Sequence, residues 1–315
     1  MIVTTNLQQQ PPGCPIAVAL GCFDGVHLGH QAVIGRAVET GRAQGLLPAV
    51  FTFTLGRDRP QGKAGAGRLV SDTMKDAVLE ALGVEYVCSP DFDAFREMSP
   101  QAFVQDLLLD HLQAKVLVCG YDFHFGHLAA GNPQLLRELC QPRGVQVLVV
   151  PPVQLAGEPV SSTRIRQAVS QGEMELARTL LGRPYGLDFP IVQGNHLGRK
   201  LQFPTINQPF PPDFVLPRFG VYGTLAQVEG RWYPAVTNVG VKPTIGTDTP
   251  LAETYLQGYS GDLYGRRVLV ELLSFLRPER KFPNVEALRE QIARDARQAQ
   301  EMGQGELARR QGESR

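Results

Sequence analysis

The sequence predicts an α/β protein with two parts: a parallel β-sheet covered by helices, followed by an antiparallel β-barrel. In the first half, apolar segments of strand length alternate with helical segments, which is typical of a parallel sheet buried on both faces. After residue 182 the segments become short and alternating, with Gly, Pro, Asn and Asp between them, which is typical of antiparallel strands. The length of 315 residues is also typical of two domains.

The first half contains strand-like and helix-like segments in regular alternation. One expected helix starts at Ser71 or Asp72 as a cap and stops at Gly83. Parallel strands place their carboxyl ends at one edge of the sheet, where such folds bind ligands. The expected strands are residues 15–20, 47–55, 86–90, 114–120 and 145–152, and the expected helices between them are 31–43, 71–85, 99–112 and 132–144.

The second half contains short apolar runs and one final amphipathic helix. The helix begins near Asn284 and has an apolar face of Val285, Leu288, Ile292, Ala296 and Ala299. The runs are residues 187–194, 219–228, 231–240, 253–259 and 266–276. With a helix stop at Gly182, we expect one domain over 1–182, a second over 183–308, and a frayed tail over 309–315.

Charge and cysteine content exclude several classes of function. Lys and Arg together number 31, as do Asp and Glu, so the chain has no net positive charge that would favour binding to nucleic acid or to a membrane surface. The five cysteines form no CxxC pair, which favours free thiols and a cytoplasmic location. The first 15 residues lack the pattern of a signal peptide, and no apolar run reaches about 18 residues, the length of a membrane span. We expect small-molecule partners, with transient self-association left open.

The segment GCFDGVHLGH, residues 21–30, follows the first strand and opens the first helix. Gly21 and Gly25 let the backbone approach a ligand closely, and a helix N-terminus favours phosphate. His27 and His30 are three residues apart, so they face the same side of a helix. Two imidazoles there suit a triphosphate whose charge grows during transfer at the α-phosphorus.

The two histidines have other interpretations that these residues leave open. Histidines near the start of a helix are also found as caps or as surface residues. A His-x-x-His pair is also found as half of a metal site, for which Cys22 and Asp24 are the nearby ligands. A choice between these readings requires further segments of the chain.

Two further segments also follow strands of the first half. In VSSTRIRQAV, residues 160–169, Arg164 and Arg166 fall in the first helical turn, where a cation is unfavourable unless an anion is bound. The alternative is a capped helix with surface arginines. In GYDFHFGHLAAGN, residues 120–132, Asp122 suits a ribose hydroxyl and the phenylalanines suit a flat ring. The alternative is an apolar, glycine-rich turn.

Together these segments resemble the adenylyltransferase half of bacterial bifunctional riboflavin kinase/FAD synthetases. The shared pattern is Gly-x-Phe-Asp-Gly-x-His-x-Gly-His, then Gly-x-Asp-Phe-x-Phe-Gly, then Ser-Ser-Thr-x-x-Arg. The resemblance implies a Rossmann-like nucleotidyltransferase domain that adenylylates FMN with ATP. It implies an ATP site of Gly21, Phe23, Asp24, Gly25, His27, His30, Asp122, Ser162, Thr163 and Arg166, with His27, His30 and Arg166 in catalysis, and a flavin site of Phe123, Phe125 and Asn132.

One departure from that family follows the second strand. The family usually carries a Pro-His-Pro element there, whereas this chain has LGRDRPQGKAGAG, residues 55–67, with no histidine. Arg57 and Arg59 are candidates to replace the lost contact. The alternative is a weakened or absent adenylyltransferase, so that the chain acts as a riboflavin kinase only.

The second half carries GNHLGRKLQFPTIN, residues 194–207. Thr205 and Asn207 are two residues apart, so on a strand they face the same side and offer oxygen ligands that suit Mg²⁺. Glu253, near the start of another strand, suits a general base that takes a proton from a substrate hydroxyl. The alternatives are a turn for the first pair and an ordinary surface residue for Glu253.

This half resembles the riboflavin kinase half of the same family. GRKLQFPTIN is similar to the family's Gly-Arg-x-Leu-Gly-Phe-Pro-Thr-x-Asn, with Gln202 in place of a glycine, and DLYG and FLRPERKF are similar to its closing segment. The resemblance implies Gly194, Arg199, Thr205 and Asn207 on ATP, Mg²⁺ on Thr205 and Asn207, and Glu253 as the base. It covers about residues 15–300 and implies riboflavin, FMN, FAD and ATP as ligands. A flavin carrier without catalysis is a further alternative.

Overall fold

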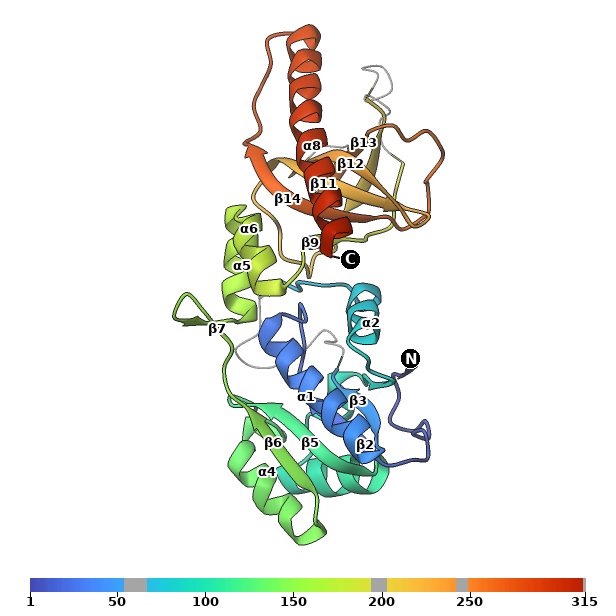
Figure 1. The fold of residues 1–315 in the computed structure, drawn as a ribbon, viewed down its shortest axis with the longest axis vertical. Helices are drawn as coiled ribbons and strands as arrows, with labels where there is room; N and C mark the ends of the chain where they lie inside the picture. Colours follow the sequence, from blue (N-terminus) through green and yellow to red (C-terminus); the bar gives the residue numbers. More distant parts are fainter. Residues whose placement is uncertain (54–66, 194–202, 242–248, 314–315) are drawn as a thin grey trace. The chain divides into compact units, whose positions relative to one another are not determined.

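The computed structural model of the chain describes residues 1–53, 67–193, 203–241 and 249–313 (Figure 1). Its contacts divide the chain into two units: Met1–Gly65 with Asp72–Ser161, and Ala66–Ser71 with Ser162–Arg315. The contacts thus group the two helices that precede residue 182 with the second unit, whereas the domain boundary expected from the sequence places them in the first.

The first unit contains a parallel six-stranded sheet with the order β1-β4-β3-β2-β5-β6. The chain reverses its direction of winding between the neighbouring strands β2 and β5, and ligands of such sheets bind beyond the carboxyl ends at this point. The strand β1 was not expected, and it pairs with β4 at the edge of the sheet. The bounds are β1 Ile2–Thr4, β2 Ile16–Leu20, β3 Leu47–Phe51, β4 Tyr86–Cys88, β5 Ala114–Gly120 and β6 Gln146–Val150.

Both faces of this sheet are buried, as expected, and the two faces of β2 enter different cores. Ile16, Val18 and Leu20 belong to one core and Ala17 and Ala19 to the other. Helices α1 and α2 contribute to the second core, and α4 and the π-helical segment η2 contribute to the first, so helices cover both sides (Figure 1). The bounds are α1 Leu28–Gln44, α2 Asp72–Ala81, α3 Pro100–Ala102, η2 Phe103–His111 and α4 Pro133–Cys140.

The remaining short elements of the first unit lie in its connections. They include a small hairpin, β7 (Gln154–Leu155) with β8 (Glu158–Pro159), after the last strand of the sheet. Short 3₁₀ turns are found at Phe92–Ala94, His127–Ala129 and Gln141–Arg143. The helix expected over 99–112 is present as α3 and η2, and the Ser99 hydroxyl caps its start by accepting from the Ala102 N–H at 3.1 Å.

The second unit begins with two helices and continues as an antiparallel sheet with the order β10-β13-β12-β11-β14-β9. Val192, which follows β9, forms a bridge with Asn207 of β10, so the two ends of the strand order approach each other as in a barrel. Gly182 ends the second helix in a left-handed conformation (φ 75°), as expected. The bounds are α5 Ser162–Gln171, α6 Met174–Leu181, β9 Tyr185–Leu187, β10 Thr205–Pro209, β11 Gly220–Val228, β12 Arg231–Val241, β13 Pro250–Leu256 and β14 Leu269–Arg277.

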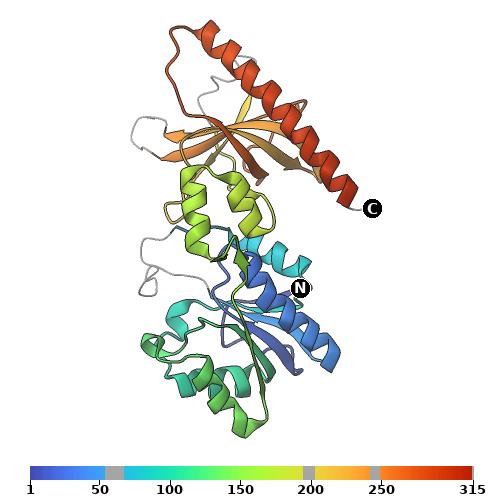
Figure 2. The same ribbon diagram turned by 60° about the vertical axis from the view of Figure 1, so that its left-hand side comes forward.

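The long C-terminal helix α8, Val285–Glu313, lies across the outer face of this sheet (Figure 2). Ala296 and Ala299 of the expected apolar face pack against Val221 of β11 and Val236 of β12. The start of the helix contributes less, since Val285 is 64% exposed. The small side chains let the helix approach the sheet closely.

Residues 309–313, expected as part of a frayed tail, are instead the last turn of α8. The buried carboxylate of Glu306 accepts hydrogen bonds from Arg178, Arg309 and Arg310, and Arg310 also bonds Glu271 and lies over the Trp232 ring. Burial works to raise the pKa of Glu306, but the hydrogen bonds from the arginines prevail and hold it at about 2. This cluster fixes the end of the helix.

Candidate functional site

The loop between β2 and α1 has an unusual backbone. Phe23 (φ 51°), Gly25 (φ 83°) and Val26 (φ 42°) all adopt positive φ, which is unfavourable for a β-branched residue such as Val26. The side chains of Phe23 and Val26 are 1% and 0% exposed and belong to the core under α1. Strain of this kind persists only where the surrounding structure holds it, and it is commonly found at functional sites.

His27 is the N-cap of α1, and it also contacts His30. Nδ1 of His27 accepts a hydrogen bond from the His30 backbone N–H at 3.3 Å. The two rings are stacked with centroids 3.5 Å apart, and the Phe23 ring meets His30 edge-on at 5.3 Å. Because Nδ1 is an acceptor in this cap, a neutral His27 carries its proton on Nε2. The cap interpretation is therefore correct for His27.

Gly29 leaves space for the His27 ring. A Cβ at Gly29 would lie 3.2 Å from both Cε1 and Nδ1 of His27. The glycine thus makes room for the imidazole directly above the first turn of the helix. The N-terminal end of α1 and the imidazole beside it form a candidate site for a phosphate group, because a helix N-terminus favours an anion.

The metal-site interpretation of the histidines has no support from the geometry. Within the described part of the chain, no group of three or more His, Cys, Asp and Glu side chains is placed to hold a metal ion. Asp24 lies within the loop and is half-buried, and Cys22 accepts hydrogen bonds through its carbonyl oxygen.

The Cys22 carbonyl accepts two hydrogen bonds that sequence reasoning missed. Nζ of Lys75, from α2, donates to it at 3.1 Å, and the Thr52 hydroxyl donates to it at 2.9 Å. Lys75 is 8% exposed and shares a helix face with the buried Leu79. A lysine at an apolar position of an amphipathic helix is the signal that identifies such a residue in the sequence.

The loop after β5 lies beside the loop after β2, because Leu20 and Cys119 are paired at the carboxyl ends of these strands. Asp122 is exposed, and its carbonyl oxygen bonds Nδ1 of His124 at 2.9 Å. Asp122, Gly21 and Gly25 therefore follow the carboxyl ends of their strands, as the sequence predicts, and the structure shows that these two strands are neighbours.

The three residues expected on the flavin have different surroundings. Phe123 is half-buried and stacks on Phe125 with centroids 5.6 Å apart. Phe125 is 5% exposed and packs against Phe103, so its ring is part of the core. The Asn132 side chain caps α4 by accepting from the N–H groups of Gln134 and Leu135.

The Ser-Ser-Thr-x-x-Arg segment forms the start of α5 in the second unit. Ser162 and Thr163 lie in the first turn of this helix. Nε of Arg166 donates to the carbonyl oxygen of Gly67 at 2.6 Å. This bond fixes one edge of a guanidinium group that carries further donors.

The sheet register of the second unit brings the expected kinase residues together. Asn207 of β10 is directly opposite Glu253 of β13, which in turn is opposite Asn238 of β12. Thr205 is two residues before Asn207 and shares its face of the sheet. Asn207 is 7% exposed, and Nδ2 of Asn238 donates to Glu279 at 2.9 Å. A hydroxyl, two amides and a carboxylate thus lie in neighbouring positions on one face.

Several expected residues lie outside the described residues. They are Gly194, Arg199 and Gln202 of the glycine-rich approach, and Arg57 and Arg59 of the segment that replaces Pro-His-Pro.

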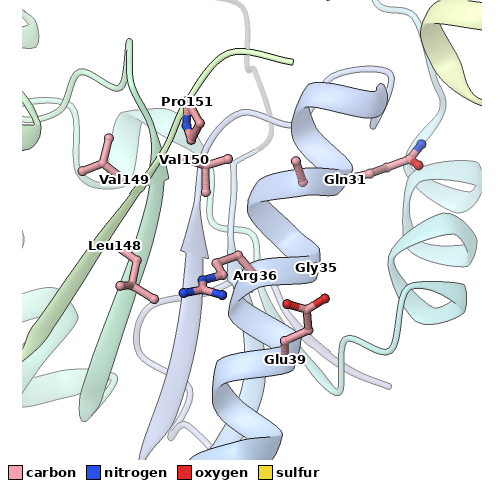
Figure 3. Close-up of a pocket in the computed structure, with 9 residues that line it drawn as sticks. Gln31, Gly35, Arg36, Glu39, Leu148, Val149, Val150 and Pro151 are labelled. Atoms are coloured by element: carbon pink, nitrogen blue, oxygen red, sulfur yellow. The ribbon is translucent and has the colours of Figure 1, made fainter. Parts of the chain in front are cut away.

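A separate groove of about 460 Å³ runs between α1 and β6 in the first unit (Figure 3). Arg36 and Glu39 of α1 stand over an apolar wall from Leu148 to Pro151. None of the residues that the sequence assigns to ATP or flavin lines this groove. The loop with His27 and His30 is therefore the better candidate site, since it combines donors, a helix N-terminus and a strained backbone.

Comparison with known proteins agrees with the division into two functional parts. The sequence model of the FAD synthetase family matches residues 9–164, and that of the riboflavin kinase family matches residues 181–303. A bifunctional riboflavin kinase/FMN adenylyltransferase of Escherichia coli K12 is 36% identical over 94% of this chain and 95% of its own length. The chain belongs to the bifunctional riboflavin kinase/FMN adenylyltransferase family.

Other members of this family give the same result. The Listeria monocytogenes enzyme is 35% identical over 88% of this chain and 89% of its own length, and the Bacillus subtilis enzyme is 32% identical over 90% of each. A solved Streptococcus pneumoniae structure, named as a macrolide-efflux protein, shares the fold with a TM-score of 0.82 and 29% identity, covering 93% of this chain and 96% of its own. Among the described helices, none is long and apolar enough to cross a membrane.

Proposed function

We propose that each half of the chain catalyses one of two successive ATP-dependent reactions. The second half transfers the γ-phosphoryl group of ATP to riboflavin and forms FMN and ADP. The first half transfers the adenylyl group of ATP to FMN and forms FAD and pyrophosphate. The observation that carries this proposal is that two family models match separate halves, each of which contains one of the residue clusters described above.

For adenylyl transfer, we propose that the loop from Gly21 to His30 binds the triphosphate of ATP. The FMN phosphate oxygen attacks the α-phosphorus, one P–O bond forms, and the bond to the leaving pyrophosphate breaks. Nε2–H of His27, the His30 ring and the N–H groups of the first turn of α1 stabilise the charge that develops on the phosphates. Ser162, Thr163 and Arg166 are proposed as further ATP-binding residues, and Asp122 is proposed to contact the ribose.

For phosphoryl transfer, we propose Glu253 as the general base. Its carboxylate takes the proton from the ribityl 5′-hydroxyl while that oxygen attacks the γ-phosphorus and ADP leaves. The side-chain oxygens of Thr205 and Asn207 fit Mg²⁺, because both are hard ligands on the face that carries Glu253. When bound, Mg²⁺ neutralises phosphate charge; the chain's own residues orient the hydroxyl and accept its proton.

One assay tests the division of labour. Purified protein receives riboflavin, ATP and Mg²⁺, and riboflavin, FMN and FAD are separated over time. His27→Ala is expected to lower FAD formation and to spare FMN formation, whereas Glu253→Ala is expected to stop FMN formation and to spare adenylylation of supplied FMN. Equal loss of both activities in either variant contradicts the proposal. Failure of the unchanged chain to form FAD supports the alternative of a riboflavin kinase only.

Three further expectations belong to this proposal. The division at residue 182 is proposed as the functional boundary, close to the start of the riboflavin kinase match at residue 181. A cytoplasmic location is proposed from the five free cysteines. Transient self-association is tested by sedimentation at several protein concentrations.

A further inference from the structure

A buried positive charge lies beneath the loop that carries the two histidines. Lys75 is 8% exposed, and among the described residues of the first unit it is the one buried side chain with a full charge. Removal of an ammonium group from water is costly unless other oxygen atoms replace the lost solvent. The oxygen atoms that accept hydrogen bonds from Lys75 therefore indicate which part of the structure it fixes.

The ammonium group and a neighbouring hydroxyl converge on one carbonyl oxygen. Nζ of Lys75 lies 2.6 Å from Oγ1 of Thr52 and 3.1 Å from the Cys22 oxygen. An ammonium only donates, so Oγ1 accepts from Lys75 and its own proton goes to the Cys22 oxygen at 2.9 Å. Thr52 is 0% exposed, and its backbone N–H donates to the Cys88 carbonyl oxygen. The Thr52 hydroxyl that connects Lys75 to the Cys22 oxygen, here called the hydroxyl relay, is therefore fixed in place.

The Cys22 carbonyl immediately precedes the strained part of the loop. Phe23, Gly25 and Val26, with positive φ, follow it and lead directly to His27. A backbone of this kind needs contacts that outweigh its local cost. At the far end of the strained part, the Val26 oxygen accepts from Nε2 of Gln31 at 2.9 Å, so both ends are held by side chains from helices.

We propose that Lys75 is a positioning residue of the adenylyltransferase site. Its ammonium fixes the position of the Cys22 carbonyl and thereby the conformation of the loop that follows. This loop, in turn, positions the His27 ring and the first turn of α1, which together form the proposed polyphosphate site. Its charge also lies in the low-dielectric interior below this loop, where it favours an anionic ligand. This inference rests on the proposed adenylyl transfer in the first half of the chain.

The test replaces Lys75 by methionine in the full chain and measures both reactions. Lys75→Met is expected to lower kcat for FMN adenylylation by about tenfold or more, because displacement of His27 and of the first turn of α1 misplaces the reacting groups. Riboflavin phosphorylation, which the second unit performs, is expected to stay within about twofold and to report that the protein is folded. Lys115→Met, at an exposed lysine of β5, is the matched control and is expected to change neither rate.

Two further measurements separate positioning from a general structural effect. In protein labelled at its six histidines, Lys75→Met is expected to shift the ring signals of His27 and His30 without any substrate present. This readout stays valid if the unchanged chain forms no FAD, so failure of the proposed function and failure of this inference are distinguishable. In combination with His27→Ala, Lys75→Met is expected to reduce adenylylation by less than the product of the two single losses.

The outcomes divide as follows. Adenylylation within about twofold of the unchanged chain, with unshifted histidine signals, overturns the inference. Fully multiplicative losses in the double variant also overturn it, since Lys75 then acts elsewhere. If Lys75→Met does not fold, Thr52→Val removes the hydroxyl of the relay and decides: a fall in adenylylation of about threefold or more supports the inference, and an unchanged rate overturns it.

Discussion

Gly29→Ala tests directly whether the position of the His27 ring matters. The added Cβ would lie 3.2 Å from Cε1 and Nδ1 of His27 and 3.5 Å from the Val160 carbonyl oxygen. The first two distances are shorter than ordinary van der Waals contact, so the imidazole must move by a few tenths of an ångström. The backbone of Gly29 does not have positive φ, so alanine itself is allowed there.

Stability and activity are expected to respond differently to this change. Movement of the ring weakens the cap bond between Nδ1 and the His30 N–H, and loss of such a cap costs about 1 kcal/mol. Replacement of glycine by alanine inside a helix gains about 1 kcal/mol, so the net change in the free energy of unfolding is close to zero. Adenylylation is expected to fall by about tenfold or more, because transfer at the α-phosphorus depends on the placement of the His27 ring beside the phosphates.

The assay measures initial rates of pyrophosphate and FAD formation from FMN and ATP. Gly35→Ala is the matched control on the same helix, because a Cβ there would meet nothing within 4 Å. The control is expected to keep full activity and to raise the free energy of unfolding by up to about 1 kcal/mol. An unchanged adenylylation rate in Gly29→Ala refutes the reasoning, as does an equal loss in the control.

Three other predictions follow from contacts in the second unit. Gly67→Ala places a Cβ against a neighbouring backbone nitrogen, so it is expected to break the hydrogen bond from Arg166 to the Gly67 oxygen and to lower FAD formation. In the control Gly305→Ala the added Cβ meets open space, and FAD formation is expected to stay unchanged. Asn207→Ala is expected to raise the Mg²⁺ concentration required for half-maximal FMN formation and not that for FAD formation; equal Mg²⁺ curves contradict the ligand assignment. The pKa of Glu306 is depressed from 4.5 to about 2, so its ionised form stabilises the folded protein above about pH 4.5, and this contribution is lost as pH falls toward 2. Glu306→Gln is therefore expected to flatten the dependence of Tm on pH in that window.

Much of the fold follows from patterns that are local in the sequence. The segment 15–20 predicts β2 because five consecutive apolar residues suit a strand buried on both faces. The stop at Gly182 was predictable because a left-handed residue at a helix end favours glycine. By contrast, β1 has three residues and becomes a strand only by pairing with β4, which no local pattern encodes.

The end of α8 shows how tertiary contacts override a local signal. Residues 309–315 are polar and rich in charge, which predicts fraying. The structure instead places Arg310 between Glu306, Glu271 and the Trp232 ring, so the last turn is held by partners far away in sequence. Such partners are not visible in the spacing of a single segment.

The candidate sites were predictable to different depths. His27 and His30 were identified from their spacing, but the cap bond and the ring stacking depend on loop conformations that only the structure contains. The pairing of Asn207 with Glu253 depends on strand register, which the sequence does not specify for positions this far apart along the chain. Lys75 was missed because a lysine in a helix ordinarily faces solvent.

The most direct test of two independent sites in one chain is complementation between variants. Glu253→Ala supplied with riboflavin is expected to form neither FMN nor FAD, and His27→Ala is expected to accumulate FMN. An equimolar mixture of the two purified variants is expected to form FAD from riboflavin and ATP, because FMN released by one is adenylylated by the other. Absence of FAD in the mixture, while each variant retains its expected single activity, contradicts the account.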